Sequence, residues 1–216
     1  MSYTPTRIIK TDSPEVWEVT KKTLAAGGLV LFCTESTYGI GAALGAGPEV
    51  MERLASLKGR DGQKPFPLVG ASVEIVEEFC ALPQALQILG RACWPGPLTV
   101  AGCPRGSVPP QILSPVGTVG VRVSSHPVAR RVAELAGGIV TATSANLAGH
   151  LPARSVEELG SLAEAVDLIL DSGLAPGGPP SSVVGWDEQG LVVYREGALR
   201  TGVLEGILKS AGVSHG

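Results

Sequence analysis

The chain has 216 residues, 44% of them hydrophobic and only 17% charged, and its formal net charge is −3. This weakly acidic balance argues against wholesale nucleic-acid binding, which normally needs a basic surface, although it leaves room for a local phosphate pocket. No run approaches the ~18 consecutive apolar residues of a membrane span, and the polar first twelve residues lack the apolar core of a signal peptide. We expect a single cytoplasmic domain over residues 1–216, with a sizeable core.

The four cysteines carry no metal or disulfide signature. Cys33, Cys80, Cys93 and Cys103 are scattered, with no C-x-x-C pair and no nearby histidine. Scattered thiols in a chain without a signal peptide indicate reduced, mostly structural side chains. We therefore expect no structural metal.

The first predicted helix and strand lead to a polar segment. Apolar residues recur at helical spacing after Asp12 and stop at Gly27-Gly28, and the apolar run over 29–33 indicates a strand buried on both faces. Directly after it stands TESTYGIG, residues 34–41. Its hydroxyls, carboxylate and phenol suit a small polar ligand, and a turn with incidental hydroxyls explains them equally well.

Basic residues follow the next helix. Residues 48–57 present one apolar face at helical spacing and predict that helix. Lys58, Arg60 and Lys64 come next, separated by glycines. Three cations within seven residues are typical of a phosphate clamp. Most basic loops are merely solvated, so both interpretations stay open.

A partly buried arginine is predicted further along the chain. Residues 116–125 alternate as a strand, with valines on one face and Arg122 on the other. Burying Arg122 is costly without an anionic partner, which is either a structural carboxylate or a carboxylate or phosphate of a substrate. His126 precedes a proline that opens a helix, and we assign it to capping or to the surface rather than to catalysis.

A second polar segment follows an apolar run. The run over 138–141 predicts a strand, and Ser144 and Asn146 stand where that strand leaves its sheet. Loops past the carboxyl ends of strands are where α/β sheets usually bind ligands. An ordinary polar turn is the plainer interpretation of Ser-Ala-Asn alone.

The remaining elements complete an α/β pattern with a mixed, parallel and antiparallel sheet. Ser155 and Glu158 have the spacing of a capping box at the start of one of these helices. The expected elements are helices over 72–80, 83–93, 155–162 and 201–211, strands over 98–101 and 166–170, and a hairpin of 181–186 with 191–195.

Cations and hydroxyls gather at the predicted strand ends, as Arg122 and Arg195 do, or in neighbouring loops such as the 58–64 segment. We find no Ser-His-Asp set, no GxGxxG motif and no P-loop. This composition favours binding of a polyphosphate and a small zwitterion over nucleophilic catalysis by a side chain.

An ordered series of motifs resembles the YrdC/Sua5 family of threonylcarbamoyl-AMP synthases over about residues 12–200. The length is similar to that of the short, single-domain form. Cys33, Asp61, Gly185 and Glu196 depart from residues that are common in the family. The matching motifs are TESTYGIG (34–41), Lys58-x-Arg60, WPGPLT (94–99), VRV (121–123) with SHP (125–127), Ser144-Ala-Asn146, SSVV (181–184) and Arg195-x-Gly197.

The resemblance implies a nucleotidyltransferase reaction. The family joins L-threonine, bicarbonate and ATP, with Mg²⁺, into L-threonylcarbamoyladenylate and releases pyrophosphate. Partner proteins then transfer the threonylcarbamoyl group to adenosine 37 of tRNA, and weak tRNA binding is compatible with this role.

The resemblance also implies roles for individual residues. Catalytic roles fall to Lys58, Arg60, Ser144 and Asn146. The implied ATP contacts are Arg60, Lys64, Ser144 and Arg195, and the implied threonine contacts are Thr34, Ser36, Tyr38, Arg122 and Ser181.

Two other functions are considered. One is a non-catalytic paralogue that binds RNA, which the acidic net charge disfavours. The other is a carbamoyl-adenylate-forming domain of the kind fused in hydrogenase maturation proteins, which the absence of the accompanying domains disfavours.

Overall fold

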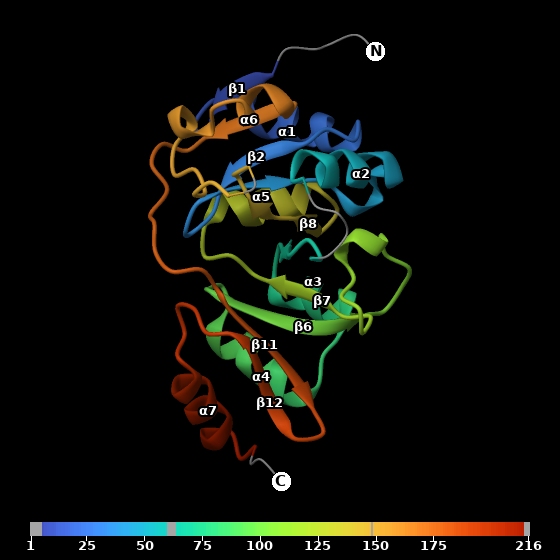
Figure 1. The fold of residues 1–216 in the computed structure, drawn as a ribbon, viewed down its shortest axis with the longest axis vertical. Helices are drawn as coiled ribbons and strands as arrows, with labels where there is room; N and C mark the ends of the chain where they lie inside the picture. The colour runs from blue at the N-terminus through green and yellow to red at the C-terminus, as the bar shows by residue number, and fades with distance from the viewer. Residues whose placement is uncertain (1–5, 60–63, 148, 214–216) are drawn as a thin grey trace.

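The computed structural model describes residues 6–59, 64–147 and 149–213. Helices and strands alternate along most of the chain (Figure 1). The helices are α1 (Val16–Ala25), α2 (Pro48–Leu57), α3 (Val73–Phe79), α4 (Gln84–Cys93), α5 (Pro127–Leu135), α6 (Leu162–Ala165) and α7 (Thr201–Ser210). The strands are β1 (Arg7–Lys10), β2 (Val30–Cys33), β3 (Tyr38–Gly41), β4 (Leu68–Gly70), β5 (Cys80–Ala81), β6 (Leu98–Pro104), β7 (Val119–Arg122), β8 (Ile139–Thr141), β9 (Thr143–Ser144), β10 (Leu168–Asp171), β11 (Ser182–Asp187) and β12 (Gly190–Arg195).

The strands form two mixed sheets. The α/β prediction with parallel and antiparallel strands is confirmed, although the sequence indicated one sheet and the structure has two. A five-stranded sheet has the order β1-β10-β2-β3-β9, and a larger sheet has the order β12-β11-β6-β7-β4-β8, with β5 beside β6. The five-stranded sheet lies toward one end of the molecule and the β11–β12 hairpin toward the other (Figure 1). Both sheets combine parallel and antiparallel pairs.

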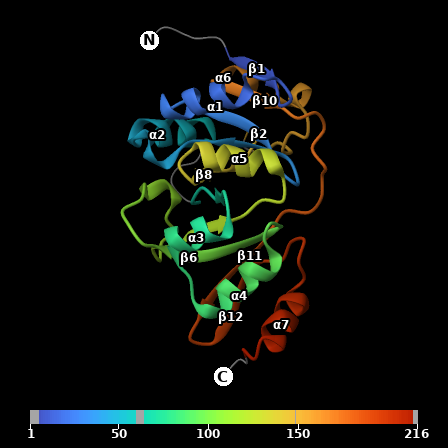
Figure 2. The same ribbon diagram turned by 180° about the vertical axis from the view of Figure 1, so that it is seen from behind.

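Strand β2 is buried on both faces, as the apolar run over 29–33 predicts. In β2, Leu31 and Cys33 belong to one hydrophobic cluster, whereas Val30 and Phe32 belong to another. Helices α1 and α5 pack on the side of the second cluster. Figure 2 shows these two helices from behind, with α4 and α7 beside the larger sheet. Among the described residues, no helix is both long and apolar enough to span a membrane.

The two sheets meet where the chain passes from β8 to β9. Strand β8 belongs to the larger sheet and β9 to the five-stranded one, so residues 139–144 serve both. The Thr141 N–H donates to the Ala42 carbonyl at 3.1 Å, and the Ala42 N–H donates to Thr141 Oγ1 at 2.8 Å. Because both groups are buried, these bonds fix the position of one sheet against the other.

Several short strands were not predicted, and each lacks a clear sequence pattern. Strand β1 buries only Ile9, β3 reads YGIG, and β4 has three residues. Glycine is depleted in strands, so sequence reasoning assigned the β3 residues to a loop. Pairing with β2 and β9 makes them a strand.

The predicted helix over 155–162 is wrong. A 3₁₀ helix (Val156–Leu159) ends at Gly160, which has φ of 55°, and the separate helix α6 follows. The capping box is also wrong, because the Ser155 side chain makes no cap hydrogen bond. The Glu158 carboxylate accepts instead from the Arg154 N–H at 2.7 Å.

The close approach of strands at Gly41 gives a stability prediction. A Cβ atom at Gly41 would lie 2.5 Å from Phe32 Cε1 and 2.8 Å from the Thr141 carbonyl oxygen. Gly41→Ala is therefore expected to lower the free energy of unfolding by about 1–3 kcal/mol. Urea denaturation measures this change.

Gly45→Ala is the matched control, because a Cβ atom there meets nothing within 4 Å. It should change the free energy of unfolding by no more than about 0.5 kcal/mol. Equal stability of the two variants would contradict tight packing at the junction of the sheets.

Candidate active site

The predicted site residues lie where strands end. Thr34 and Ser36 follow the carboxyl end of β2, Arg122 ends β7 and Arg195 ends β12. Ser181 immediately precedes β11, whose first residue pairs with Leu98 of β6. Since β6 also pairs with β7, the structure brings Arg122, Ser181 and Arg195 to neighbouring strands at one end of the larger sheet.

Arg122 pairs with a carboxylate of the protein. Its Nη1 donates to Glu35 Oε1 at 2.7 Å, and the two side chains are 12% and 16% exposed. The second oxygen of Glu35 accepts from Ser124 Oγ. Of the two partners that the sequence left open for Arg122, the structure shows the structural carboxylate.

Burial governs the charges around this pair. Desolvation lowers the pKa of Arg122, Glu35 opposes that shift, and the nearby charge of Arg195 adds to it. Burial also raises the pKa of Cys33 to about 11, with the Glu35 charge as a further cause. The Cys33 thiol therefore stays protonated at neutral pH.

Ser181 links Arg195 to the larger sheet. The Arg195 guanidinium donates to the Ser181 carbonyl from Nε at 3.1 Å and from Nη2 at 2.8 Å. Nη2 also lies 3.2 Å from Ser181 Oγ, which shares a hydrogen bond of 2.8 Å with Thr99 Oγ1. This network holds a hydroxyl and a guanidinium side by side.

A glycine makes that contact possible. A Cβ atom at Gly197 would lie 2.2 Å from the Pro180 carbonyl oxygen and 2.7 Å from the Ser181 carbonyl carbon. The Gly197 N–H donates to Ser182 Oγ at 2.9 Å. The Arg-x-Gly spacing therefore lets residues 180–182 lie against the chain that follows Arg195.

Lys58 forms a second polar cluster with Ser144 and Asn146. Its Nζ donates to the Ser144 carbonyl at 2.8 Å, the Asn146 carbonyl at 2.5 Å and Asn146 Oδ1 at 2.9 Å. Ser144 Oγ donates to the same Oδ1 at 2.6 Å. Lys58 is only 6% exposed, so it supports the 144–146 turn from beneath.

The 34–38 hairpin lies between the two clusters. Thr34 Oγ1 donates to the Thr37 carbonyl at 2.7 Å and lies 3.4 Å from Ser36 Oγ. Gly39 of β3 pairs with Ser144 of β9. The hairpin thus connects Thr34 and Ser36 with the Lys58 cluster.

The Tyr38 hydroxyl is hydrogen-bonded to the protein backbone. It donates to the Gly173 carbonyl at 2.8 Å and accepts from the Ser172 N–H at 3.0 Å. The side chain is fully buried, and burial raises its pKa to about 12. Contact between Tyr38 and threonine stays a prediction, and the hydroxyl already holds the 172–173 segment.

Two of the predicted cations and one histidine lie apart from these clusters or outside the described residues. Lys64 is exposed, and Arg60 lies outside the described residues. His126 occupies the N-cap position of α5 without a side-chain cap bond, and burial lowers its pKa. Its Nδ1 is buried and has no hydrogen-bond partner among the described residues.

Sequence reasoning did not select Glu35, Ser124 or Thr99 as site residues. Glu35 stands within the polar segment that the sequence singled out, and Arg122 required an anion. Together these two signals pointed to Glu35. Thr99 ends the WPGPLT motif and Ser124 lies on the Arg122 face of the predicted strand, but neither signal assigned a contact to these residues.

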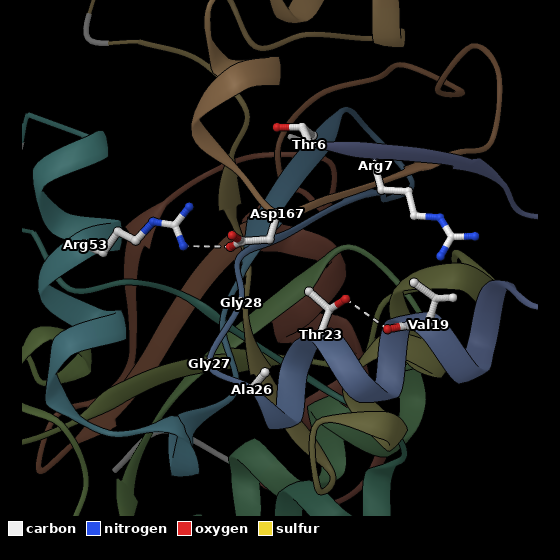
Figure 3. Close-up of a pocket in the computed structure, with 9 residues that line it drawn as sticks. All are labelled: Thr6, Arg7, Val19, Thr23, Ala26, Gly27, Gly28, Arg53 and Asp167. Carbon is white, nitrogen blue, oxygen red and sulfur yellow. Dashed lines mark hydrogen bonds and ion pairs between the residues drawn. The ribbon is translucent and has the colours of Figure 1, made fainter. Parts of the chain in front are cut away.

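A surface cavity of about 550 Å³ lies at the opposite edge of the five-stranded sheet (Figure 3). Gly28 and Asp167 precede β2 and β10, whereas the site follows the other end of β2. Arg53 Nη1 donates to Asp167 Oδ2 at 2.7 Å, and the same oxygen accepts from the Leu29 N–H. The cavity contains none of the predicted site residues, and two of the charged residues that line it, Arg53 and Asp167, pair with each other.

The fold and site define an α/β protein with cationic and hydroxyl groups at adjoining strand ends. Residues 22–197 match the Sua5/YciO/YrdC family model, which is described as telomere recombination. A Marinobacter nauticus protein named threonylcarbamoyl-AMP synthase is 33% identical over 182 residues, 81% of this chain and 94% of that relative. The chain belongs to the Sua5/YciO/YrdC family.

Two solved structures share this fold. P. abyssi Sua5, complexed with L-threonine, has a TM-score of 0.84 and 28% identity over 95% of this chain and 61% of that one. E. coli YciO has a TM-score of 0.78 and 25% identity over 90% of this chain and 97% of that one. The chain therefore spans about three fifths of the length of the Sua5 protein and nearly all of YciO.

Replacing Lys58 tests the cluster that it supports. Lys58→Met removes a buried cation and three hydrogen bonds to the 144–146 turn, and it leaves the Asn146 carbonyl without this donor. We expect the free energy of unfolding to fall by about 2–3 kcal/mol, measured by urea denaturation.

Lys22→Met is the control, because the pair that Lys22 forms with Glu18 is exposed. This control should shift stability by less than about 0.5 kcal/mol. If Lys58→Met were equally neutral, Lys58 would not support the turn.

Proposed function

We propose that this protein is a threonylcarbamoyl-AMP synthase, a nucleotidyltransferase. It forms L-threonylcarbamoyladenylate and pyrophosphate from L-threonine, bicarbonate and ATP. The observation that carries the proposal is the cluster of Arg122, Ser181 and Arg195 at one end of the larger sheet, close to the turn after β2. The name of the Marinobacter nauticus relative and the threonine bound to P. abyssi Sua5 support the same activity.

Threonine binds at the strand ends in this proposal. Arg122 binds the substrate carboxylate, since a guanidinium matches a carboxylate in geometry and charge. Ser181 contributes a hydroxyl, which Thr99 and Arg195 hold in place. Thr34 and Ser36 line the adjoining wall, with Tyr38 behind them. A pocket that bonds the threonine hydroxyl rejects analogues that lack it.

ATP binds next to the Lys58 cluster in this proposal. Ser144 and Arg195 contact ATP from the strand ends, and Arg60 and Lys64 contribute charge to its phosphates. Lys58 and Asn146 act by holding the 144–146 turn. Mg²⁺ accompanies ATP as part of the substrate, bound through the phosphates.

The reaction needs no nucleophile from the protein. The threonine amine bonds to the carbon of bicarbonate, which loses one oxygen as water, and a carbamate forms. A carbamate oxygen then bonds to the α-phosphorus of ATP while the bond from that phosphorus to pyrophosphate breaks. Positioning of the two substrates and stabilisation of the phosphate charge carry the rate enhancement.

The product supplies tRNA modification. Partner proteins transfer the threonylcarbamoyl group to adenosine 37 of tRNA, in the cytoplasm. The acidic chain contributes little electrostatic attraction to tRNA itself, so we assign tRNA recognition mainly to those partners.

The activity is tested with purified protein, ATP, Mg²⁺, bicarbonate and L-threonine. Pyrophosphate release is followed, and threonylcarbamoyladenylate is identified by mass spectrometry. Product that requires both threonine and bicarbonate is expected. Binding of ATP and threonine without product would instead favour a non-catalytic paralogue, and binding of neither would overturn the proposal.

Substitution of the two principal arginines tests their assigned roles. Arg122→Ala removes the proposed carboxylate ligand, and Arg60→Ala removes a proposed phosphate ligand. Each is expected to lower kcat/KM by about 100-fold or more, chiefly through threonine for Arg122 and ATP for Arg60.

Arg91→Ala is the matched control, because Arg91 pairs with Glu77 at the surface of α4. It should leave kcat/KM unchanged. Wild-type turnover in Arg122→Ala or in Arg60→Ala would refute the role assigned to that arginine.

A further inference from the structure

Glu35 is a partly buried carboxylate to which no part of the reaction assigns a role. It stands in the turn after β2, and both of its oxygens are engaged. Oε1 accepts from Arg122 Nη1 at 2.7 Å, and Oε2 accepts from Ser124 Oγ. Because both oxygens are held, the side chain has a fixed place between Thr34 and Ser36 on one side and Arg122 on the other.

These contacts connect the two sheets. Glu35 follows β2 of the five-stranded sheet, whereas Arg122 ends β7 of the larger sheet. Ser124 Oγ also accepts from the His126 N–H at 3.2 Å, at the start of α5. The orientation of Arg122 is therefore set from the opposite sheet and from the chain that follows its own strand.

The ion pair engages only one of the three guanidinium nitrogens. Only Nη1 of Arg122 donates to Glu35, and Nε and Nη2 make no hydrogen bond with any residue in the described ranges. By contrast, Arg91 donates to both oxygens of Glu77 from Nε and Nη2, in a two-pronged pair. An internal carboxylate that filled the ligand's place would be expected to take that two-pronged form.

The charges near Arg122 also favour an incoming anion. Arg195 lies close enough for its charge to act on Arg122, and Glu35 counters only one of the two guanidinium charges. The cluster of Arg122, Arg195 and Glu35 thus retains net positive charge. A substrate carboxylate supplies the missing negative charge.

We propose that Glu35 is a positioning residue for threonine binding: it holds Arg122 by Nη1 and presents the remaining edge of the guanidinium to the threonine carboxylate. This inference rests on the proposed function, because it takes Arg122 as the ligand of that carboxylate. Glu35 acts through Arg122 and touches no reacting atom.

The test compares Glu35→Ala and Glu35→Gln in the pyrophosphate-release assay, with KM measured separately for threonine and ATP. Glu35→Ala is expected to raise KM for threonine by about tenfold or more, since Arg122 loses its fixed orientation. KM for ATP should stay within about twofold. Glu35→Gln keeps an oxygen that accepts from Arg122, so its KM for threonine should lie between those of the wild type and Glu35→Ala.

Glu77→Gln is the matched control, because it alters an Arg-paired carboxylate outside the site. It should leave both KM values unchanged. An unchanged or lowered KM for threonine in the Glu35 variants would overturn the inference, and a lowered value would show that Glu35 competes with the substrate. Thermal melting confirms that the variants fold, and Glu35→Gln carries the test if Glu35→Ala does not.

Arg122→Ala separates failure of the inference from failure of the proposed function. If Arg122→Ala raises KM for threonine but the Glu35 variants do not, only the positioning role is wrong. If the wild type makes no product, calorimetry of threonine binding to the same variants replaces KM. No threonine binding by the wild type would overturn both proposals.

Discussion

The charge of Arg122, held at the seam between the two sheets, is the constraint on which the site depends. Losing one partner of a buried ion pair typically costs about 3–5 kcal/mol, because the other charge is left uncompensated. Glu35, in the turn after β2 of the five-stranded sheet, supplies the compensating charge for Arg122, which belongs to the larger sheet. Docking of the two sheets therefore also brings Glu35 to Arg122 and sets the orientation of the guanidinium.

Lys58 is a second buried cation, and the acceptors that surround it differ from those of Arg122. Two backbone carbonyls and the Asn146 side-chain oxygen surround its ammonium group, and none of these three acceptors carries a formal charge. The dipoles of these acceptors offset part of the desolvation cost of the ammonium group. The same three bonds hold the 144–146 turn in place, so a buried lysine supports the backbone beside Ser144.

The sequence predicted most helices and the strand ends that form the site, because apolar periodicity and buried runs are local signals. It predicted that Arg122 needs an anion but left the partner open, because Glu35 lies 87 residues away in the chain. Strand β3 could not be recognised from YGIG, since its pairing with β2 and β9 is what makes it a strand. The helix over 155–162 failed because Gly160 has a positive φ, which no periodicity reveals. Arg60 lies outside the described residues, so its role stays a prediction.

Two departures from the family pattern have local physical reasons around Arg195. A Cβ atom at Gly185 would lie 2.8 Å from the Tyr194 ring, so glycine lets that ring lie over the hairpin. Glu196 accepts from the Thr201 N–H and Oγ1 and from Arg200, and these bonds lower its pKa to about 2. The carboxylate therefore stays ionised at neutral pH and fixes the start of α7. Residues 194 and 196 flank Arg195, so both departures make their contacts directly beside this arginine in the chain.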